Sequence, residues 1–197
     1  MGDLILLRHG ETAWSRERKH TGRTDIPLTP YGEEQATAVR PLLADRTLVR
    51  VLCSPAERAR RTAELAGLKA ETTPCLWEWD YGAYEGRTTP DIQRERPGWY
   101  LWRDGVEPDL SPGGLPGETA EQVGERVDAV LSEVRTALAE GDVALVAHGH
   151  VLRVLTARWL GLPPDEGRLF ALATATLSTL GTEHGYPVIS SWNVPPR

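Results

Sequence analysis

The chain has 197 residues, of which 40% are hydrophobic and 25% charged, and its formal net charge is −6. The negative charge argues against a nucleic-acid-binding protein, which needs a basic surface for phosphate contacts. No apolar run approaches the roughly 18 residues of a membrane-spanning helix, so we expect no membrane partner either. The length suits one domain over residues 1–197 with its own core, and we expect a lid or insert within it at about 78–118.

The cysteine content and the N-terminal segment both favour a cytoplasmic protein. Cys53 and Cys75 are the only cysteines, too few for the disulfide framework of a small secreted domain. The apolar run LILL at residues 4–7 is too short for a signal peptide, and an acidic residue precedes it.

Four short apolar segments are predicted to form strands that lead into turns or helices. They lie at residues 4–10, 49–55, 142–150 and 173–182. The first three do not alternate, which is typical of strands buried on both faces of a sheet. The fourth alternates, so we expect an outer strand that forms a hairpin with the segment after it.

Helices are predicted between these strands. Pro30 opens a helix that Pro41 must kink or interrupt. Residues 54–57 (SPAE) and 119–122 (TAEQ) have the capping-box pattern, so each predicts the start of a helix. Alternating strands and helices indicate an α/β fold with a mostly parallel central sheet, helices on both faces and one antiparallel edge strand.

Polar side chains follow three of the predicted strands. Arg8 and His9 follow the first, Ser54 follows the second with Arg58 in the first turn of the next helix, and His148 follows the third. Because parallel strands end at one edge of the sheet, we expect these side chains to converge. With the amides of a helix N-terminus, they form a pocket suited to a dianion such as a phosphoryl group. A neutral imidazole in that pocket is a competent nucleophile.

Six motifs occur in order over nearly the whole chain. They are LRHGETAW, TGRTDIPLTPYGEEQA, CSPAERARRTA, LWEWDYGAYEG, GETAEQVGERV and VAHGHVLRVL. Together they resemble the histidine phosphatase superfamily, the phosphoglycerate-mutase-like proteins. The resemblance implies a phosphoglycerate-mutase-like fold and a metal-independent phosphatase that needs no cofactor.

The resemblance also assigns roles to individual residues. It implies that His9 attacks phosphorus and forms a phosphohistidine, with its ring oriented by the carbonyl of Gly10. Glu78 matches the proton donor, which protonates the leaving alkoxide and then helps water attack the phosphohistidine. The implied catalytic residues are His9, Glu78, His148, Arg8 and Arg58. The implied phosphate-binding residues are Arg8, Ser15, Thr21, Gly22, Arg58, His148 and Gly149.

Several of these assignments have alternatives. Asp80 and Glu85 lie close to Glu78 in the sequence, and either could share the role of the acid. Ser15 stands where the family often has asparagine, which leaves one phosphate contact open. His148 and the nearby His150 could form a metal pair, but no further ligands stand at suitable spacing, so we expect no metal site.

The aromatic residues around the predicted acid have two interpretations. They are Trp77, Trp79, Tyr81, Tyr84, Trp99, Tyr100 and Trp102. They can pack the core and lid, which we favour, or form an aromatic wall beside the phosphate site. His20 and His184 are predicted to be loop residues without a role in the site.

The lid favours hydrolysis over phosphoryl transfer between two substrate positions. Residues 87–120 contain four arginines, no lysine and six acidic residues, a poor clamp for a second phosphate. We therefore expect a phosphatase that acts on a small-molecule phosphate ester, such as a sugar phosphate. A cofactor-dependent phosphoglycerate mutase and a non-catalytic phospho-ligand-binding module are the alternatives. Relatives often dimerise through a sheet edge, and the C-terminal hairpin offers one for a homodimer.

Overall fold

Six segments form one sheet in the computed structural model, which describes residues 2–196. The strands are β1 (Leu4–Arg8), β2 (Leu48–Cys53), β3 (Glu71–Thr72), β4 (Asp142–Ala147), β5 (Leu177–Glu183) and β6 (Tyr186–Val194). Their order is β3-β2-β4-β1-β5-β6, and the first four are mutually parallel. β5 runs antiparallel to β1, and β6 turns back antiparallel to β5. The predicted mostly parallel sheet is confirmed, and the antiparallel strand belongs to the expected C-terminal hairpin.

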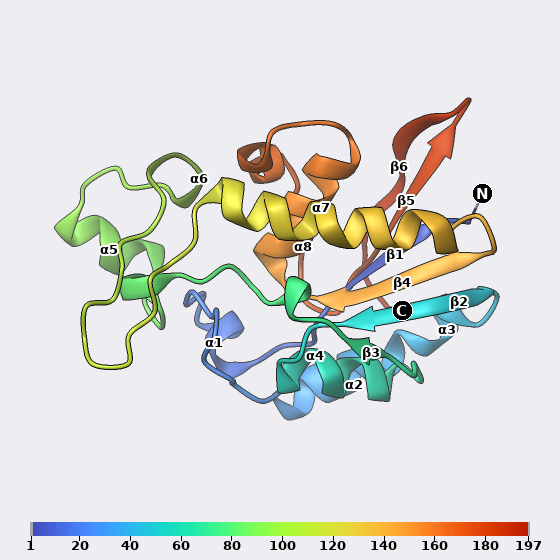
Figure 1. Cartoon of the computed structure of the whole chain (residues 1–197). Helices are drawn as coiled ribbons and strands as arrows, with labels where there is room; N and C mark the ends of the chain where they lie inside the picture. Colours follow the sequence, from blue (N-terminus) through green and yellow to red (C-terminus); the bar gives the residue numbers. More distant parts are fainter. Residues whose placement is uncertain (1, 197) are drawn as a thin grey trace.

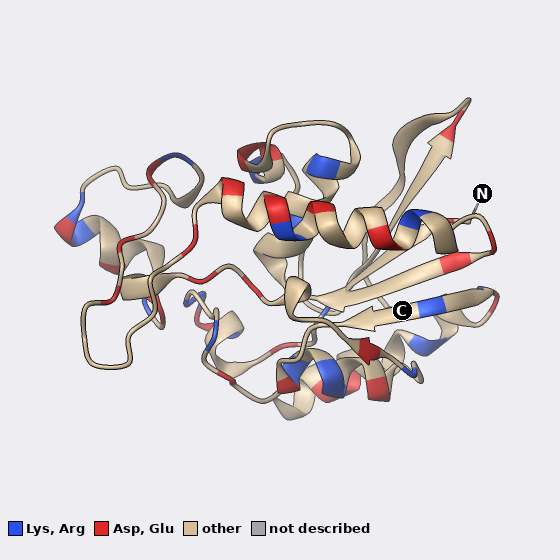
Figure 2. Cartoon of the chain, viewed as in Figure 1, with Lys and Arg blue, Asp and Glu red and all other residues tan. Residues whose placement is uncertain are grey.

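Helices cover both faces of this sheet, as Figure 1 shows. They are α1 (Ala13–Arg16), α2 (Pro30–Ala38), α3 (Arg40–Leu43), α4 (Glu57–Leu65), α5 (Thr89–Glu95), α6 (Leu101–Asp104), α7 (Ala120–Ala137) and α8 (Gly149–Trp159). Short 3-10 helices span Pro74–Leu76, Gly82–Tyr84 and Pro164–Leu169. Both signs of charge are interspersed along the helices (Figure 2). Within residues 2–196, none of the helices has the length and apolar character needed to cross a membrane.

The alternation of side chains along β1 divides the core into two layers. Leu4 and Leu6 pack into the cluster that contains the buried residues of α7 and α8. Ile5 and Leu7 point the other way and pack with Ala59 of α4 and its neighbours. Successive side chains of a strand face opposite sides of a sheet, so one apolar run serves both layers. The expectation of strands buried on both faces is therefore confirmed for β1.

The capping-box predictions had different outcomes. In α7, the side chains and backbone amides of Thr119 and Gln122 make both reciprocal hydrogen bonds, as expected. The helix predicted to begin within residues 54–57 with Ser54 as its cap starts later than expected. α4 begins at Glu57, and its N-cap residue, Ala56, makes no side-chain hydrogen bond. The Ser54 hydroxyl, which would have capped the helix, faces another strand end and lies in the site described below.

Two glycines bring the loop after β1 directly against α2. A Cβ added to Gly10 would lie 2.3 Å from the carbonyl oxygen of Gly32, and one added to Gly32 would lie 2.1 Å from that of Glu11. No side chain fits at either position without moving backbone. The residue that precedes Gly10 is thereby held at the end of its strand.

Residues 81–117, which we call the cap segment, leave and rejoin the rest of the chain at one point. The amide of Glu118 donates to the carbonyl of Asp80 at 2.9 Å, and the amide of Asp80 donates to Glu118 Oε2 at 2.9 Å. Arg126 of α7 binds both carboxylate oxygens of Glu118 and the carbonyls of Cys75 and Trp77. The cap segment carries α5 and α6 beyond the carboxyl ends of the parallel strands (Figure 1). This is the place where the sequence predicts a lid.

Candidate active site

His9 stands at the carboxyl end of β1 and is only 4% exposed. Its Nδ1 lies 2.7 Å from the carbonyl oxygen of Gly10. A carbonyl can only accept, so Nδ1 carries the proton and Nε2 keeps a free lone pair. Burial, followed by the charges of Arg58 and Arg8, lowers the pKa of His9 well below its usual value. The side chain is thus a neutral imidazole with one unprotonated nitrogen.

His148 lies against His9 from the end of the neighbouring strand β4. The two ring centroids are 5.2 Å apart, with an angle of 60° between the ring planes. Arg58 Nε donates to His148 Nδ1 at 3.1 Å, so the proton of His148 is on Nε2, which donates to Ser54 Oγ at 2.7 Å. Burial and the charge of Arg58 lower the pKa of His148 well below its usual value, so this ring is neutral too.

Arg58 is fully buried at the start of α4. Its Nη1 donates to the carbonyl of Thr24 at 3.0 Å, and its Nη2 donates to those of Gly22 at 2.9 Å and Thr21 at 3.2 Å. The guanidinium therefore holds the loop at residues 21–24 against the end of the sheet. Burial lowers the pKa of Arg58, although the group keeps its charge because an arginine pKa starts so high.

A cavity of about 380 Å³ opens over this edge of the sheet. Six of the predicted site residues line it: Arg8, His9, Ser15, Thr21, Glu78 and Gly149. The other three, Gly22, Arg58 and His148, are not on its wall. The structure thus brings the predicted residues together in two layers, a lining and a buried support behind it.

Arg8 lines this cavity and carries a buried donor without a partner among residues 2–196. Its Nη1 donates to the carbonyl of Leu172 at 2.5 Å, whereas its buried Nε has no partner among residues 2–196. A Cβ on Gly149 would lie 3.3 Å from Arg8 Cζ, so glycine at that position leaves room for the guanidinium. Native structures rarely leave a buried donor without an acceptor, and an anion in the cavity would supply one.

Glu78 lines the cavity with its carboxylate fixed on the first turn of α8. Oε1 accepts from the amides of Trp79 at 2.9 Å and Val151 at 2.8 Å, and Oε2 accepts from that of His150 at 2.9 Å. A helix N-terminus offers free amides and a partial positive charge, which suits a carboxylate. The candidate acid is thereby tied to the helix that follows His148.

The two alternative acids point elsewhere and do not line the cavity. Asp80 Oδ1 accepts from the amide of Gly82 at 3.0 Å. Glu85 accepts from the amides of Gly22 at 2.9 Å and Thr24 at 3.1 Å, and burial raises its pKa. The backbone amide of Gly22 is therefore already hydrogen-bonded to Glu85, although the resemblance assigns Gly22 to phosphate binding.

Ser15 and Thr21 reach the cavity with hydroxyl protons that are already donated. Ser15 Oγ donates to the carbonyl of Thr12 at 3.0 Å and accepts from its amide at 2.9 Å, which forms the capping box of α1. Thr21 Oγ1 donates to the carbonyl of Lys19 at 3.1 Å. Each hydroxyl must rotate before it can donate to a phosphate oxygen.

Sequence reasoning missed several residues of the cavity wall. They are Arg18, Lys19, His20, Thr89, Leu101, His150, Arg153 and Leu172. His20, expected to be an unremarkable loop residue, is buried and its ring stacks parallel to that of His150, with centroids 6.4 Å apart. The positions of His150 and Arg153, three apart on α8, are the signal that could have been used, because such residues share one helical face. Ser54, which the sequence places at the end of the second strand, contacts His148 and does not line the cavity.

Most of these aromatic residues pack in the core, as favoured above, and two of the packed ones also line the cavity. Tyr81, Tyr100 and Trp102 line the cavity. Trp99 and Tyr84 are buried in the core, with ring centroids 5.1 Å apart. Tyr81 and Trp102 of the cap segment therefore pack in the core and line the cavity at the same time.

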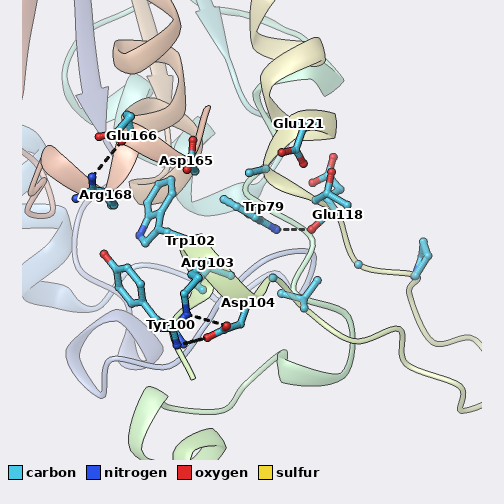
Figure 3. A pocket seen from close by; sticks show the side chains of 17 residues that line it. Trp79, Tyr100, Trp102, Arg103, Asp104, Glu118, Glu121, Asp165, Glu166 and Arg168 are labelled. Atoms are coloured by element: carbon cyan, nitrogen blue, oxygen red, sulfur yellow. Dashed lines mark hydrogen bonds and ion pairs between the residues drawn. The ribbon is translucent and has the colours of Figure 1, made fainter. Parts of the chain in front are cut away.

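A second cavity, of about 810 Å³, is lined by residues of α6, of the start of α7 and of the 3-10 helix Pro164–Leu169 (Figure 3). It shares Tyr100, Leu101 and Trp102 with the first cavity and contains none of the predicted site residues. Its labelled charged residues largely pair with each other or with backbone, as Arg103 does with Asp104. Residues 2–196 also contain no group of three His, Cys, Asp or Glu side chains placed to hold a metal ion.

Comparison with known proteins identifies relatives of similar length. A family model described as the histidine phosphatase superfamily (branch 1) matches residues 4–195. The chain is 43% identical over 185 residues to an acid phosphatase of Mycobacterium tuberculosis, across 92% of this chain and 87% of that protein. It is 35% identical over 191 residues to sedoheptulose 1,7-bisphosphatase of Saccharomyces cerevisiae, across 80% of this chain and 67% of that protein. The solved structure of the open reading frame Rv3214 product of M. tuberculosis matches with a TM-score of 0.91 and 40% identity, over 100% of this chain and 99% of that one.

Proposed function

Because this chain belongs to the histidine phosphatase superfamily and is a phosphoric monoester hydrolase, we propose that it hydrolyses small phosphorylated metabolites through a phosphohistidine on His9. The observation that carries the proposal is that a neutral His9 with a free Nε2 lines the same cavity as Arg8, whose Nε has no partner among residues 2–196. A nucleophile and an oxyanion donor then face the same cavity.

In the first step, the lone pair of His9 Nε2 attacks phosphorus in line with the ester oxygen. The N–P bond forms as the P–O bond to the organic group breaks, and protonated Glu78 gives its proton to the leaving oxygen. Arg8 donates to the phosphoryl oxygens, where charge is concentrated in the transition state. Arg58 and His148 support the reaction from behind His9, chiefly through the positive charge of Arg58 and the position it imposes on the loop at residues 21–24.

In the second step, water attacks the phosphohistidine and the N–P bond breaks. Glu78, now a carboxylate, accepts a proton from that water, and the bonding electrons return to His9 Nε2. The products are an alcohol and inorganic phosphate. The side chains of this site handle every proton and charge in the scheme, so the proposal includes no metal and no organic cofactor.

The wall of the cavity and the names of the relatives support a sugar phosphate or similar small ester as substrate. Tyr81, Tyr100 and Trp102 offer a partly apolar surface for the organic group. One relative is a bisphosphatase of a seven-carbon sugar, by its name. The lid at residues 87–120 carries more acidic than basic residues, whereas cations from elsewhere in the chain also line this cavity. For the homodimer, we propose the β5–β6 hairpin, where Tyr186 is exposed, as the contact.

The proposal is tested by trapping the intermediate. The enzyme is mixed with excess p-nitrophenyl phosphate in EDTA, quenched in alkali, because phosphohistidine is labile to acid, and mapped by peptide mass spectrometry. We expect one phosphoryl group on His9 and hydrolysis that continues in EDTA. A label on another residue, or activity that EDTA abolishes, would overturn the proposed mechanism.

The lowered pKa of His9 predicts activity in acid. The imidazole attacks only when neutral, and burial lowers its pKa well below 6.5, so the nucleophile is not lost as the pH falls from 7 through 6.5. We expect kcat/KM for p-nitrophenyl phosphate to show no loss with an apparent pKa near 6.5 over this range. As the pH drops, the histidines of the unfolded chain take up protons before the buried histidines of the folded chain do. The free energy of unfolding therefore decreases once the pH is below about 6.5. Circular dichroism must confirm at each pH that the protein is folded. A profile that drops with a midpoint near 6.5 would contradict the prediction.

A further inference from the structure

The peptide groups on either side of Gly10 decide which ring nitrogen of His9 carries the proton. Nδ1 donates to the carbonyl oxygen of Gly10 at 2.7 Å, and this bond leaves Nε2 with its lone pair. If the peptide group that joins Gly10 to Glu11 turned over, an N–H group would replace that carbonyl beside the ring. Nδ1 would then have to accept, the proton would move to Nε2, and the nucleophilic lone pair would be lost. The reactivity of His9 therefore depends on the orientation of one peptide plane.

The glycine at position 10 makes this peptide plane easy to turn. A Cβ at Gly10 would lie 2.3 Å from the carbonyl oxygen of Gly32, so the close packing against α2 requires a glycine. Glycine adopts positive and negative φ about equally well, so the residue that the packing requires does not itself hold the peptide groups beside it. Contacts from other residues must hold them.

The peptide group that joins His9 to Gly10 is hydrogen-bonded at both ends. The carbonyl of His9 accepts from the amide of Ala175 at 3.0 Å, and the amide of Gly10 donates to Thr62 Oγ1 at 3.0 Å. Thr62 is fully buried on α4, and its hydroxyl donates to the carbonyl of Arg58, one turn earlier, at 2.7 Å. Because that bond uses the only hydroxyl proton, Thr62 Oγ1 is an acceptor toward Gly10. The side chain of Thr62 thus fixes the direction of this amide.

The peptide group that joins Gly10 to Glu11 is hydrogen-bonded at both ends too. Its carbonyl is the acceptor for His9 Nδ1, and its N–H group donates to Gln35 Oε1 on α2 at 2.9 Å. Hydrogen bonds at the two ends of one peptide group polarise each other. The bond to Gln35 therefore orients the carbonyl toward the ring and also makes it a better acceptor for the ring proton.

We propose that Thr62 and Gln35 are positioning residues for the nucleophile, which hold the two peptide groups around Gly10 so that His9 keeps its proton on Nδ1 and its lone pair on Nε2. This inference rests on the proposed function, in which that lone pair attacks phosphorus. Neither Thr62 nor Gln35 lines the catalytic cavity, so both act through the backbone beside His9 and not on the substrate.

The test removes each side-chain acceptor and measures the rate. Thr62→Val keeps the shape of the side chain without its hydroxyl, and Gln35→Met keeps its length without its carbonyl. With p-nitrophenyl phosphate, we expect kcat to fall at least about ten-fold in each variant and KM to stay within about two-fold, because the nucleophile changes while the groups that bind phosphate remain. Thr62→Ser keeps the hydroxyl and is expected to retain kcat within about three-fold of the wild type.

NMR spectroscopy of the protein with isotope-labelled histidine measures the tautomer of His9 directly. Long-range proton–nitrogen spectra distinguish a ring protonated on Nδ1 from one protonated on Nε2, and the signals of His9 are those that disappear in His9→Asn. We expect the Nδ1–H tautomer in the wild type and in Thr62→Ser, and a measurable share of the Nε2–H tautomer in Thr62→Val and Gln35→Met. A purely structural role would lower the melting temperature and leave the tautomer unchanged.

The chain offers a matched control for each change. Thr156 is fully buried on α8, and its hydroxyl donates to the carbonyl of Leu152 at 2.8 Å but accepts no backbone amide from residues 2–196. Gln122 Oε1 accepts from the amide of Thr119 at 2.8 Å, and Gln122 does not line the catalytic cavity. Thr156→Val and Gln122→Met lose the same kinds of hydrogen bond and are expected to keep the wild-type kcat and the wild-type tautomer of His9.

The outcomes separate this inference from misfolding and from the proposed function. Each variant must show a cooperative thermal transition, and because Gln35 is partly exposed, Gln35→Met provides the test if Thr62→Val does not fold. If His9 is phosphorylated but either variant keeps the wild-type kcat or the wild-type tautomer, the inference is wrong for that residue and the proposed function stands. If no phosphoryl group is trapped on His9, the proposed function itself fails, and the NMR spectra still decide whether Thr62 and Gln35 hold the ring.

Discussion

An asparagine at position 9 is expected to lower kcat for p-nitrophenyl phosphate by at least about 10³-fold. The amide of Asn can take over the donor that His9 Nδ1 gives to the carbonyl of Gly10, so the loop after β1 keeps its support. It has no nitrogen lone pair that can attack phosphorus, so the covalent route is closed. Stopped assays over long incubation times measure the residual rate.

A second histidine provides the matched control for this change. His184 is exposed in the turn between β5 and β6 and has a φ of 51°, a conformation that asparagine tolerates. His184→Asn is expected to keep the wild-type rate. A His9→Asn protein that retains more than a small fraction of the wild-type kcat would rule out the phosphohistidine.

Arg58→Met is expected to lower the unfolding free energy by about 3–5 kcal/mol and kcat/KM by at least about 10²-fold. The methionine removes the donors for three carbonyls, those of Thr21, Gly22 and Thr24, and leaves His148 Nδ1 without its partner. Each buried acceptor that loses its donor lowers the free energy of unfolding by about 1–3 kcal/mol. Part of this loss is offset because the variant no longer has to bury a charged guanidinium. Urea unfolding at pH 7 measures the first effect and p-nitrophenyl phosphate hydrolysis the second.

Arg60 is the control for Arg58 because it lies on the same helix. It is exposed, and its Nε donates only to the carbonyl of Pro55. Arg60→Met is expected to change stability by less than about 0.5 kcal/mol and to leave activity unaltered. Equal stability of Arg58→Met and the wild type would show that the loop at residues 21–24 does not depend on Arg58.

The sequence was sufficient for the elements whose signals are local. Apolar runs predicted the central strands, the proline and capping patterns predicted α2 and α7, and the polar residues after β1 and β4 followed from the geometry of parallel sheets. The position of Glu78 came from the family resemblance alone, because the residue lies in a loop whose course depends on backbone amides of α8.

The remaining site residues depend on contacts between distant parts of the chain. Ser54 carries a local helix-capping pattern, but in the fold its hydroxyl faces His148, 94 residues later. His20 is buried because it meets Arg87, 67 residues later, and because the cap segment closes over it. Local periodicity contains no information on such pairings, so the contact of Ser54 with His148 and the place of His20 in the site appeared only in the structure.

The meeting of Asp80 with Glu118 has a consequence for how relatives of this protein diverge. A segment that starts and ends at one hydrogen-bonded junction can change in length while the junction keeps its structure. Doubling the length of a flexible loop costs only about 0.6 kcal/mol in closure entropy. Evolution can therefore exchange residues 81–117 as a cassette, retuning which alcohol is accepted, while the nucleophile and its buried support are inherited intact. The same junction marks the two cut points for building chimeras between members of the superfamily.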